Sequence, residues 1–490
     1  MRRTTSAGPR AGHSAVLLRC AVVLGLAAML LGGEVPFDSG ASALSLSYLV
    51  VGRQDGPAGI PAAEQAVRQA GGRVVQPYPQ IGTVLAYGPA AGFARRTRNA
   101  PGVVAVGATR TAPMADAGSD AFAAGARDGR IGGDAGSEDD TPPAADPHGL
   151  AQWNLRMMGP AAGVRVPALH DVVVAVLDSG VDDTHPDLRA AVDPGRSASC
   201  ADGRPDSSPG AWRPDPAVGE SGHGTHVSGI IAADRTGDGV VGVAPGARIA
   251  AVRLLGPAGQ YYGENMVCGF LWAADHGARV INDSYFADPW KYNCPQDPDQ
   301  AAITTAVGRA VGYAQHRGAL VVASAGNDAQ DLDGPRTDDR SPNDRPDGAP
   351  PVRRRLGAEC IRLPGGLPGV LDVTAVDPDG SLAGYSNWGA GRVQLAAPGG
   401  DPDGGPQQAV VSDWPGGGYA ALAGTSMAAA HVSGAAAVEA ARNPGADGAE
   451  LARLLERAAQ PEDCPSGLVG SVGCPGAAYY GYGLLELPPR

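Results

Sequence analysis

The sequence is poor in lysine, in aromatic side chains and in positive charge. Of its 490 residues, 18% are charged and 5% are aromatic, and the net charge at pH 7 is -13. Lys291 is the single lysine, and no stretch gathers basic residues into a stripe. Because nucleic acid and anionic membranes are bound by basic surface, the sequence predicts neither as a partner. A hydrophobic content of 43% is that of a globular chain, and the length predicts one large domain with smaller attachments.

Long hydrophobic runs are scarce as well. A short apolar run from Cys20 to Gly33 follows the basic start Met1-Arg2-Arg3 and precedes an A-x-A sequence at residues 41–43. This order is typical of a secretory signal. The alternative is a membrane anchor, but the run is shorter than the ~20 residues that a spanning helix needs. We therefore expect residues 1–43 to be a signal peptide and the protein to be secreted without a stable membrane anchor.

Cysteine is infrequent, with seven residues, of which six remain after removal of the signal. An even number without any C-x-x-C spacing predicts disulfides in an exported protein, although six cysteines allow fifteen connectivities. Cys464 and Cys474 are expected to pair, because only nine residues separate them in a loop rich in glycine and proline. The other two expected pairs are Cys294 with Cys360 and Cys200 with Cys268.

Three regions follow the signal. Residues 44–112 alternate apolar strands and short helices in the order β-α-β-β-α-β of a split-βαβ module, with elements at 45–52, 61–70, 72–78, 81–88, 92–99 and 102–110. Residues 113–147 are mainly alanine, glycine, aspartate and proline, a composition that cannot bury enough surface to order itself and that predicts an exposed, cleavable acidic linker. Residues 148–490 form the large domain.

The large domain alternates near-continuous Val/Ile/Leu strands with helical segments. Strands are predicted at 171–178, 248–256, 279–285 and 318–327, and helices at 223 onward, 264–276 and 300–316. This alternation predicts the α/β class with a doubly wound, mostly parallel sheet, preceded by a small α+β ferredoxin-like domain. In such sheets the functional sites form beyond the carboxyl ends of the strands.

Two polar residues end predicted strands at that edge. Asp178 closes the run VVVAVLD, and Asn327 closes ALVVASAGN. An aspartate or asparagine in such a position is often only a turn or cap residue, so each observation alone leaves that alternative open.

A histidine and a serine lead into predicted helices. His223 lies between two glycines in GHGTHVSG, and the alternative is a metal site formed with His226, although no H-E-x-x-H motif is present. Ser426 in GTSMAAAH starts a helix that runs to about Arg442, where the helix dipole favours a developing oxyanion. The alternative for Ser426 is a simple N-cap.

Together these motifs resemble the subtilisin-like (subtilase) serine peptidase family. VAVLDSGVDDTHPDL, GHGTHVSGIIA, ASAGN and GTSMAAAHVSG occur in that family's chain order, and the resemblance covers about residues 148–490. It implies that Ser426 is the nucleophile, His223 the general base and Asp178 the orienting carboxylate, with Asn327 binding the oxyanion. His226 and His431 are then structural residues.

The resemblance also implies a substrate-binding strand, and here the sequence departs from the family. The expected substrate-binding residues are Ser284, Tyr285, Phe286 and Gly326, but the family usually has S-L-G where this chain has Ser284-Tyr285-Phe286. A bulky Phe286 in place of glycine changes the primary specificity pocket. Ala430 stands where the family usually has proline, a position that shapes the helix.

Calcium is a further implication of the resemblance. Gln152 and Asp187 fall where a family calcium site has ligands, and the loop from Ala233 to Val240 has a suitable length, whereas Thr236 replaces the usual asparagine. A structural calcium ion is therefore possible and the metal ligands stay unknown, while no cofactor is expected for catalysis. Residues 44–112 resemble the family's inhibitory propeptide.

The sequence thus predicts a monomeric serine endopeptidase, made as a self-processed zymogen, that forms an acyl-enzyme with protein or peptide substrates and has its own propeptide as a partner. A second hypothesis is a catalytically silent, secreted binding protein on the same scaffold. An α/β-hydrolase esterase is a third, but its chain order of Ser, Asp and His differs from the order here.

Overall fold

The computed structural model of the chain describes residues 44–112, 114, 152–219, 221–345, 349–350, 352–462 and 476–489. The predicted signal peptide, nearly all of the predicted linker, and Cys464 and Cys474 lie outside these ranges.

The first described region is a small four-stranded sheet with two helices. Its strands have the order β2-β3-β1-β4, and neighbouring strands pair antiparallel. The observed elements follow the predicted β-α-β-β-α-β order closely: β1 (Ser45–Gly52), α1 (Ile60–Gln69), β2 (Arg73–Tyr78), β3 (Thr83–Pro89), α2 (Phe93–Arg98) and β4 (Val103–Ala108). We refer to residues 44–112 as the N-terminal module.

The two faces of this small sheet pack against different partners, because successive side chains of a strand point to opposite faces. Tyr48 and Val50 of β1 belong to a core with the module's own helices. Leu49 and Val51 of the same strand belong instead to a core shared with helices of the large domain. The module therefore buries only one sheet face by itself.

The large domain contains a nine-stranded sheet with the order β16-β17-β13-β12-β9-β8-β5-β7-β6. Neighbouring strands are parallel except the short pair β16–β17 at one edge, which is antiparallel. The predicted doubly wound α/β class is confirmed. The strands are β5 (Val173–Asp178), β6 (Ala198–Ser199), β7 (Arg248–Arg253), β8 (Val280–Asp283), β9 (Leu320–Ser324), β12 (Val370–Val376), β13 (Leu395–Pro398), β16 (Ala459–Gln460) and β17 (Leu484–Leu485).

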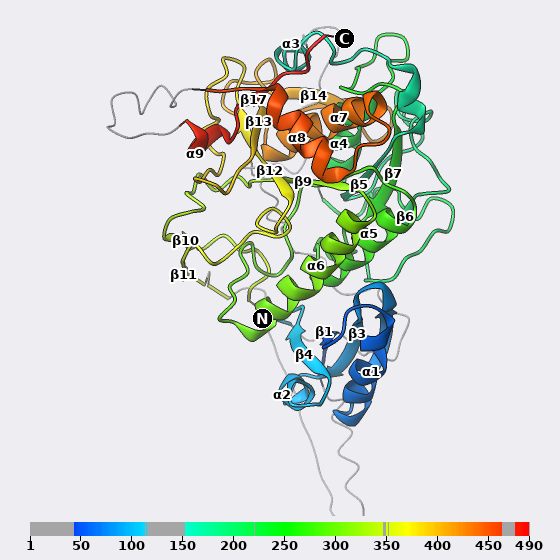
Figure 1. Cartoon of the computed structure of the whole chain (residues 1–490), viewed down its shortest axis with the longest axis vertical. Helices are drawn as coiled ribbons and strands as arrows, with labels where there is room; N and C mark the ends of the chain where they lie inside the picture. The colour runs from blue at the N-terminus through cyan, green and yellow to red at the C-terminus, as the bar shows by residue number, and fades with distance from the viewer. Residues whose placement is uncertain are drawn as a thin grey trace, which may run out of the picture. The chain divides into compact units, whose positions relative to one another are not determined.

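Helices cover both faces of this sheet (Figure 1). One face packs on α4, α7 and α8, and the other on α5 and α6, so that each face has its own hydrophobic core. Val174 and Val176 of β5 contribute to the first core, and Val173 and Leu177 to the second. The bounds are α4 (His223–Ala232), α5 (Gly263–Asp275), α6 (Pro298–His316), α7 (Thr425–Arg442) and α8 (Gly448–Ala458).

Smaller elements complete the fold. They are η1 (Pro57–Gly59), η2 (Pro79–Ile81), α3 (Trp153–Met157), η3 (Pro167–Asp171), the pair β10 (Arg336–Asp338) and β11 (Arg354–Leu356), the hairpin β14 (Val410–Trp414) and β15 (Gly418–Leu422), and α9 (Ala477–Tyr480).

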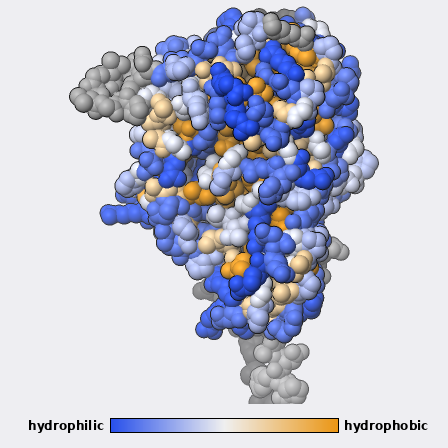
Figure 2. Space-filling view, in the orientation of Figure 1, coloured by the Kyte–Doolittle hydropathy of each residue, from blue (hydrophilic) through white to orange (hydrophobic). Residues whose placement is uncertain are grey.

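Two disulfides occur among the described residues. They join Cys200 to Cys268 and Cys294 to Cys360, as expected from the sequence. In the described ranges, none of the helices combines the length and the apolar character that a membrane crossing requires. Figure 2 shows a face on which hydrophilic residues dominate and apolar residues are scattered between them.

Candidate active site

Asp178 and His223 lie in direct contact at the carboxyl end of β5. Asp178 is the last residue of the strand and is fully buried. Its carboxylate accepts from the Ser179 backbone N–H at 2.6 Å, and the His223 Nδ1 lies 2.9 and 3.0 Å from its two oxygens. A carboxylate that faces Nδ1 fixes the tautomer with the proton on Nδ1, so the lone pair that can accept a proton is on Nε2.

The glycines around His223 are required by close packing. A Cβ atom on Gly224 would lie 2.9 Å from Asp178 Oδ1 and 2.4 Å from the Gly180 carbonyl oxygen. A Cβ atom on Gly222 would lie 2.5 Å from the Trp414 ring. The GHG sequence therefore lets the start of α4 approach both β5 and the β14–β15 hairpin, which brings the imidazole to the carboxylate.

Ser426 lies in the first turn of α7 and is 8% exposed. Its Oγ lies 3.4 Å from the Ser284 carbonyl oxygen, which belongs to the predicted substrate-binding segment. The N–H groups of a first helical turn have no carbonyl partners within their helix, and the helix dipole is positive there. This position favours negative charge on an oxygen next to Ser426.

The side-chain amide of Asn327 is oriented by Thr425. Asn327 Oδ1 accepts from the Thr425 backbone N–H at 3.0 Å and from its hydroxyl at 2.7 Å. The Thr425 Oγ1 in turn accepts from the Gly326 N–H at 3.1 Å. Because Oδ1 faces these donors, Nδ2 is directed toward Gly424, immediately before the Ser426 turn; a Cβ on Gly424 would lie 3.3 Å from it. Thr425 is a residue that sequence reasoning missed, although it adjoins Ser426 in the GTS motif.

Tyr285 contacts the imidazole of His223. The two rings meet edge to face with centroids 4.8 Å apart, and Tyr285 also stacks on Tyr261 at 3.7 Å. The segment after β8 thus brings Ser284 to Ser426 and Tyr285 to His223. An aromatic side chain in the predicted substrate-binding segment was the available signal for this packing.

The ring of Phe286 lies close to two cationic side chains. Its ring lies 5.0 Å from the Arg362 guanidinium carbon and 5.7 Å from Lys291 Nζ, and Phe286 is 4% exposed. Arg362 also lies behind Gly326, where an added Cβ would be 3.2 Å from its Cδ and Nε. Phe286 and Arg362 are therefore packed together next to Gly326, another of the predicted substrate-binding residues.

Asp283 is a second buried carboxyl group near the candidate site. It ends β8, and its Oδ1 accepts from the Tyr285 backbone N–H at 3.1 Å. Burial, together with the negative charge of Asp178, raises the pKa of Asp283 well above its usual value, although Tyr285 and Arg362 oppose this shift. Sequence reasoning missed this residue, because the acidic residue in the run VIND was assigned no role.

Two further histidines of the motifs, His226 and His431, are fully buried. Burial lowers the pKa of His226 to about 3 and that of His431 to about 4. His226 Nε2 lies 3.2 Å from two carbonyl oxygens of the β14–β15 hairpin, and His431 Nδ1 lies 2.7 Å from the Met427 carbonyl. These contacts support a structural role for both.

In the expected calcium site, the carboxylate oxygens of Asp187 already accept hydrogen bonds from backbone N–H groups. Asp187 Oδ1 accepts from the Thr236 N–H at 2.6 Å, and Oδ2 accepts from the Val240 N–H at 3.1 Å. A Cβ on Gly239 would lie 2.0 Å from Asp187 Oδ2, so the loop backbone is packed directly against the carboxylate.

Gln152 and an arginine complete this closed loop. Gln152 Oε1 accepts from the Val241 N–H at 3.1 Å and from Arg235 Nη2 at 3.2 Å, while Arg235 Nε donates to the Gly239 carbonyl at 2.8 Å. Calcium takes six to eight oxygen ligands. Here a guanidinium and amide hydrogens point at the candidate oxygens, so these residues do not fit calcium.

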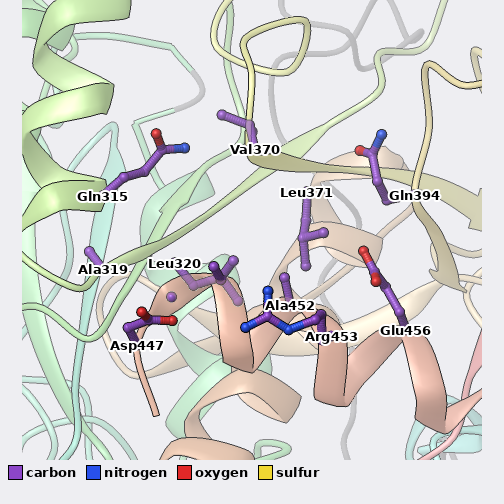
Figure 3. A pocket seen from close by; sticks show the side chains of 13 residues that line it. Gln315, Ala319, Leu320, Val370, Leu371, Gln394, Asp447, Ala452, Arg453 and Glu456 are labelled. Atoms are coloured by element: carbon purple, nitrogen blue, oxygen red, sulfur yellow. The ribbon is translucent and has the colours of Figure 1, made fainter.

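A pocket of about 420 Å³ lies at the opposite end of the sheet (Figure 3). It opens where β9 and β12 begin, at Leu320 and Val370, and α8 forms another wall with Asp447, Arg453 and Glu456. None of the predicted site residues lines it. The carboxyl end of the sheet, in contrast, gathers Asp178, Asn327 and their partners.

The chain belongs to the subtilase family. The model of that family, Peptidase_S8, matches residues 170–475. A member of this family with this fold is a serine endopeptidase that acts on peptide or protein substrates, and catalysis in the family needs no cofactor.

A sequence relative agrees with the family, and two solved structures agree with the fold. Subtilisin Savinase of Lederbergia lenta is 33% identical over 308 residues, which cover 63% of this chain and 90% of that protein. The solved structure of the epidermin leader peptide processing serine protease of Staphylococcus aureus is similar with a TM-score of 0.63 at 19% identity, over 90% of this chain and 97% of that one. Fervidolysin of Fervidobacterium pennivorans is similar with a TM-score of 0.59 at 23% identity, over 90% of this chain and 60% of its own.

Proposed function

We propose that the protein is a secreted endopeptidase that hydrolyses peptide bonds with Asp178, His223 and Ser426 as its catalytic triad. The observation that carries the proposal is the contact of His223 Nδ1 with both oxygens of a buried Asp178. The segment after β8 supports it, because Ser284 lies near Ser426 and Tyr285 contacts His223. This pair leaves Nε2 as the base for a serine hydroxyl.

The reaction would proceed through an acyl-enzyme. His223 accepts the Ser426 proton as Oγ attacks the peptide carbonyl, and the imidazolium then returns the proton to the leaving amine. The Asn327 amide and the Ser426 N–H donate to the oxyanion. Water activated by His223 releases the acyl group and restores the serine.

Labelling with a fluorophosphonate tests this assignment. The probe reacts only with an activated serine, so wild type should be labelled and Ser426→Ala should not. A folded wild type that is not labelled even after the N-terminal module has been removed would favour the alternative of a silent binding protein.

We also infer that residues 1–43 direct secretion, that residues 44–112 are an inhibitory propeptide, that 113–147 are a cleavable linker, and that 148–490 form a monomeric peptidase domain. The support for the propeptide is a set of contacts between the module and the large domain. Arg110 pairs with the buried Glu264 at 3.2 Å, and Ser47 Oγ donates to the same carboxylate at 3.0 Å. The Tyr78 hydroxyl also donates to the Gly203 carbonyl at 2.5 Å.

A tethered module has a high effective concentration beside the domain that it contacts, so cleavage within one molecule is favoured. Wild type should yield a mature chain that starts between residues 111 and 152. Ser426→Ala should accumulate uncut, at every dilution. If purified Ser426→Ala is trimmed at the same bond in the absence of another protease, self-processing is wrong.

A further inference from the structure

A buried group of three metal-ligand side chains lies between the turn after β5 and the β14–β15 hairpin. His185 and Asp187 belong to the turn, and Asp413 belongs to β14. One ligand atom from each lies within 4.8 Å of the others, and all three residues are at most 1% exposed. This group shares Asp187 with the closed loop at Gln152, but it needs only one lone pair of that carboxylate, and Oδ1 accepts from the Thr236 N–H alone among the described residues.

Asp413 is the unusual member of the group. It is fully buried, and neither of its carboxylate oxygens has a hydrogen-bond donor among the described residues. Its neighbours are the Asp187 carboxylate and His185 Nδ1, which lies 3.5 Å from its Oδ1. Two carboxylates can be joined only through a proton or a cation, because both are acceptors when ionised. Leaving such a buried charge uncompensated costs several kcal/mol.

The two ring nitrogens of His185 have different roles. Its Nε2 lies 2.9 Å from the Gly418 carbonyl oxygen, so Nε2 carries the hydrogen and Nδ1 carries the lone pair. The Asp187 backbone N–H donates to Nδ1 at 3.2 Å, and Asp413 Oδ1 lies 3.5 Å from the same nitrogen. Histidines that bind metals usually donate their other ring N–H to a carbonyl or carboxylate, which fixes the tautomer.

Asp187 is held in the same way by surrounding donors. Its carboxylate accepts from the Tyr419 hydroxyl at 3.0 Å as well as from the loop N–H groups of Thr236 and Val240. Tyr419 also packs edge to face on His185, with ring centroids 5.3 Å apart. Other groups therefore fix the orientation of His185 and Asp187, the two candidate ligands from the turn. Asp413, in contrast, faces these two residues.

We propose that His185 Nδ1, Asp187 and Asp413 bind one divalent cation of the zinc class. A dication balances the charges of both carboxylates, whereas a single shared proton would leave one negative charge buried between them. In the bound state, Nδ1 would turn its lone pair from the Asp187 N–H to the cation. One imidazole nitrogen with two carboxylates suits zinc or a similar transition metal, while calcium prefers oxygen ligands alone. The cation would tie the turn after β5 to the β14–β15 hairpin.

Metal content of the full-length Ser426→Ala chain, which should not degrade itself, tests this site. The protein is produced in medium containing zinc or cobalt, passed over a chelating resin in its folded state, and measured by elemental mass spectrometry. Because the group is buried, we expect about one metal ion per chain to survive this treatment. The cobalt form should also show visible absorption from cobalt bound by nitrogen and oxygen.

Asp413→Asn removes the central ligand charge with little change of shape and should lose most of the metal. Asp372→Asn is the matched control, since Asp372 is another buried carboxyl group, lies in β12 outside the cluster and should not affect metal content. The cobalt spectrum of the unsubstituted site stays informative if Asp413→Asn does not fold. Absence of stoichiometric zinc and cobalt from the parent chain, or retention of calcium alone, overturns the proposal.

Discussion

The two ends of the central sheet differ in what they bury. At the carboxyl ends, Asp178 and Asp283 are the last residues of their strands, and both are fully buried. Asn327 follows β9 at the same end, and α4 and α7 begin there with His223 and with Thr425 and Ser426. Buried polar groups of this kind need specific partners, and here His223 is the partner of Asp178 and Thr425 is the partner of Asn327.

At the amino ends, polar groups remain near water. Arg453 and Arg457 pair with Glu450 across one exposed surface of α8, with 40% to 59% of each side chain accessible. Ion pairs with such exposure contribute little to stability. The same strands and helices therefore hold the candidate catalytic residues at one end and form only a scaffold at the other, so substitutions at the two ends should have different readouts.

The largest expected effect is that of Asp178→Asn, which should lower kcat by about 10⁴. The Ser179 N–H bonds to Oδ1, so the new amide would turn its NH₂ toward His223 Nδ1 and impose the wrong tautomer. Steady-state kinetics on a peptide substrate measures this change. Asp447→Asn, the same substitution at the amino end, should leave kcat unchanged, and equal losses in both would remove the distinction between the ends.

Asn327→Ala should lower kcat by about 10²–10³ and leave KM nearly unchanged, because its donor matters once charge develops on the oxygen. Separate determination of kcat and KM checks this. Asn443→Ala is the matched control, since Asn443 is the C-cap residue at the far end of α7. A decrease in kcat of less than threefold for Asn327→Ala would mean that the Asn327 amide points away from the oxyanion.

Helix α5 contacts the N-terminal module near both of its ends. Glu264, in its first turn, is buried and bonds to Arg110 and Ser47, whereas Asp275, at its other end, accepts from Gln80 at the surface. Glu264→Gln should shorten the delay between self-cleavage and full activity about tenfold, because truncating a buried charge pair costs more than truncating an exposed one.

The delay is measured by following peptide hydrolysis after processing begins. Asp275→Asn should change it by less than about twofold. If both variants release the module equally fast, burial at the carboxyl end does not govern inhibition.

The buried side chains of His226 and His431 predict that the free energy of unfolding depends on pH. Their pKa values are lowered to about 3 and about 4, whereas unfolded histidine titrates near pH 6.5. Below pH 6.5 the unfolded chain therefore binds more protons, so this contribution is complete above pH 6.5 and is lost as the pH falls toward 4. Each histidine should contribute a slope of about 1.4 kcal/mol per pH unit.

The free energy of unfolding is measured with urea at pH 6, 5 and 4 for Ser426→Ala with and without His226→Gln. The buried acids act in the opposite direction in both proteins, so the difference between the two reports His226 alone. The stability difference between the two proteins should shrink as the pH falls. A difference that is constant with pH would contradict the neutral, buried imidazole.

Much of this arrangement is accessible from the sequence. The strand and helix periods predicted the module's element order and the parallel sheet, because burial on both faces leaves runs such as VVVAVLD. Asp178, His223, Asn327 and Ser426 were identified from motifs, and the structure brings Asp178 and His223 into contact. The roles of the four remain predictions that the labelling and kinetic experiments address.

Other features depend on contacts between distant segments. Asp413 meets His185 from a strand more than two hundred positions later, and no local pattern predicts an aspartate that lacks a donor. Arg235 closes its own loop on Gln152, which the loop length alone did not reveal. Arg362 fills the space behind Gly326 through folding of a remote segment. Such pairings arise from tertiary packing and not from sequence periodicity.

The smallest expected effect is that of Asp447→Ala at the amino end. Asp447 is the N-cap of α8, and its Oδ1 accepts from the Glu450 N–H at 2.9 Å. Loss of this cap should lower the free energy of unfolding by about 1 kcal/mol. The adjacent Gly448 packs against the Ala319 carbonyl, where an added Cβ would be 2.3 Å away, so the helix start should stay in place when the cap is lost. Urea unfolding in the Ser426→Ala background measures the stability change, and kcat/KM in the active chain should equal that of wild type. A clear loss of activity with this variant would show that the amino end of the sheet is coupled to the site at the other end.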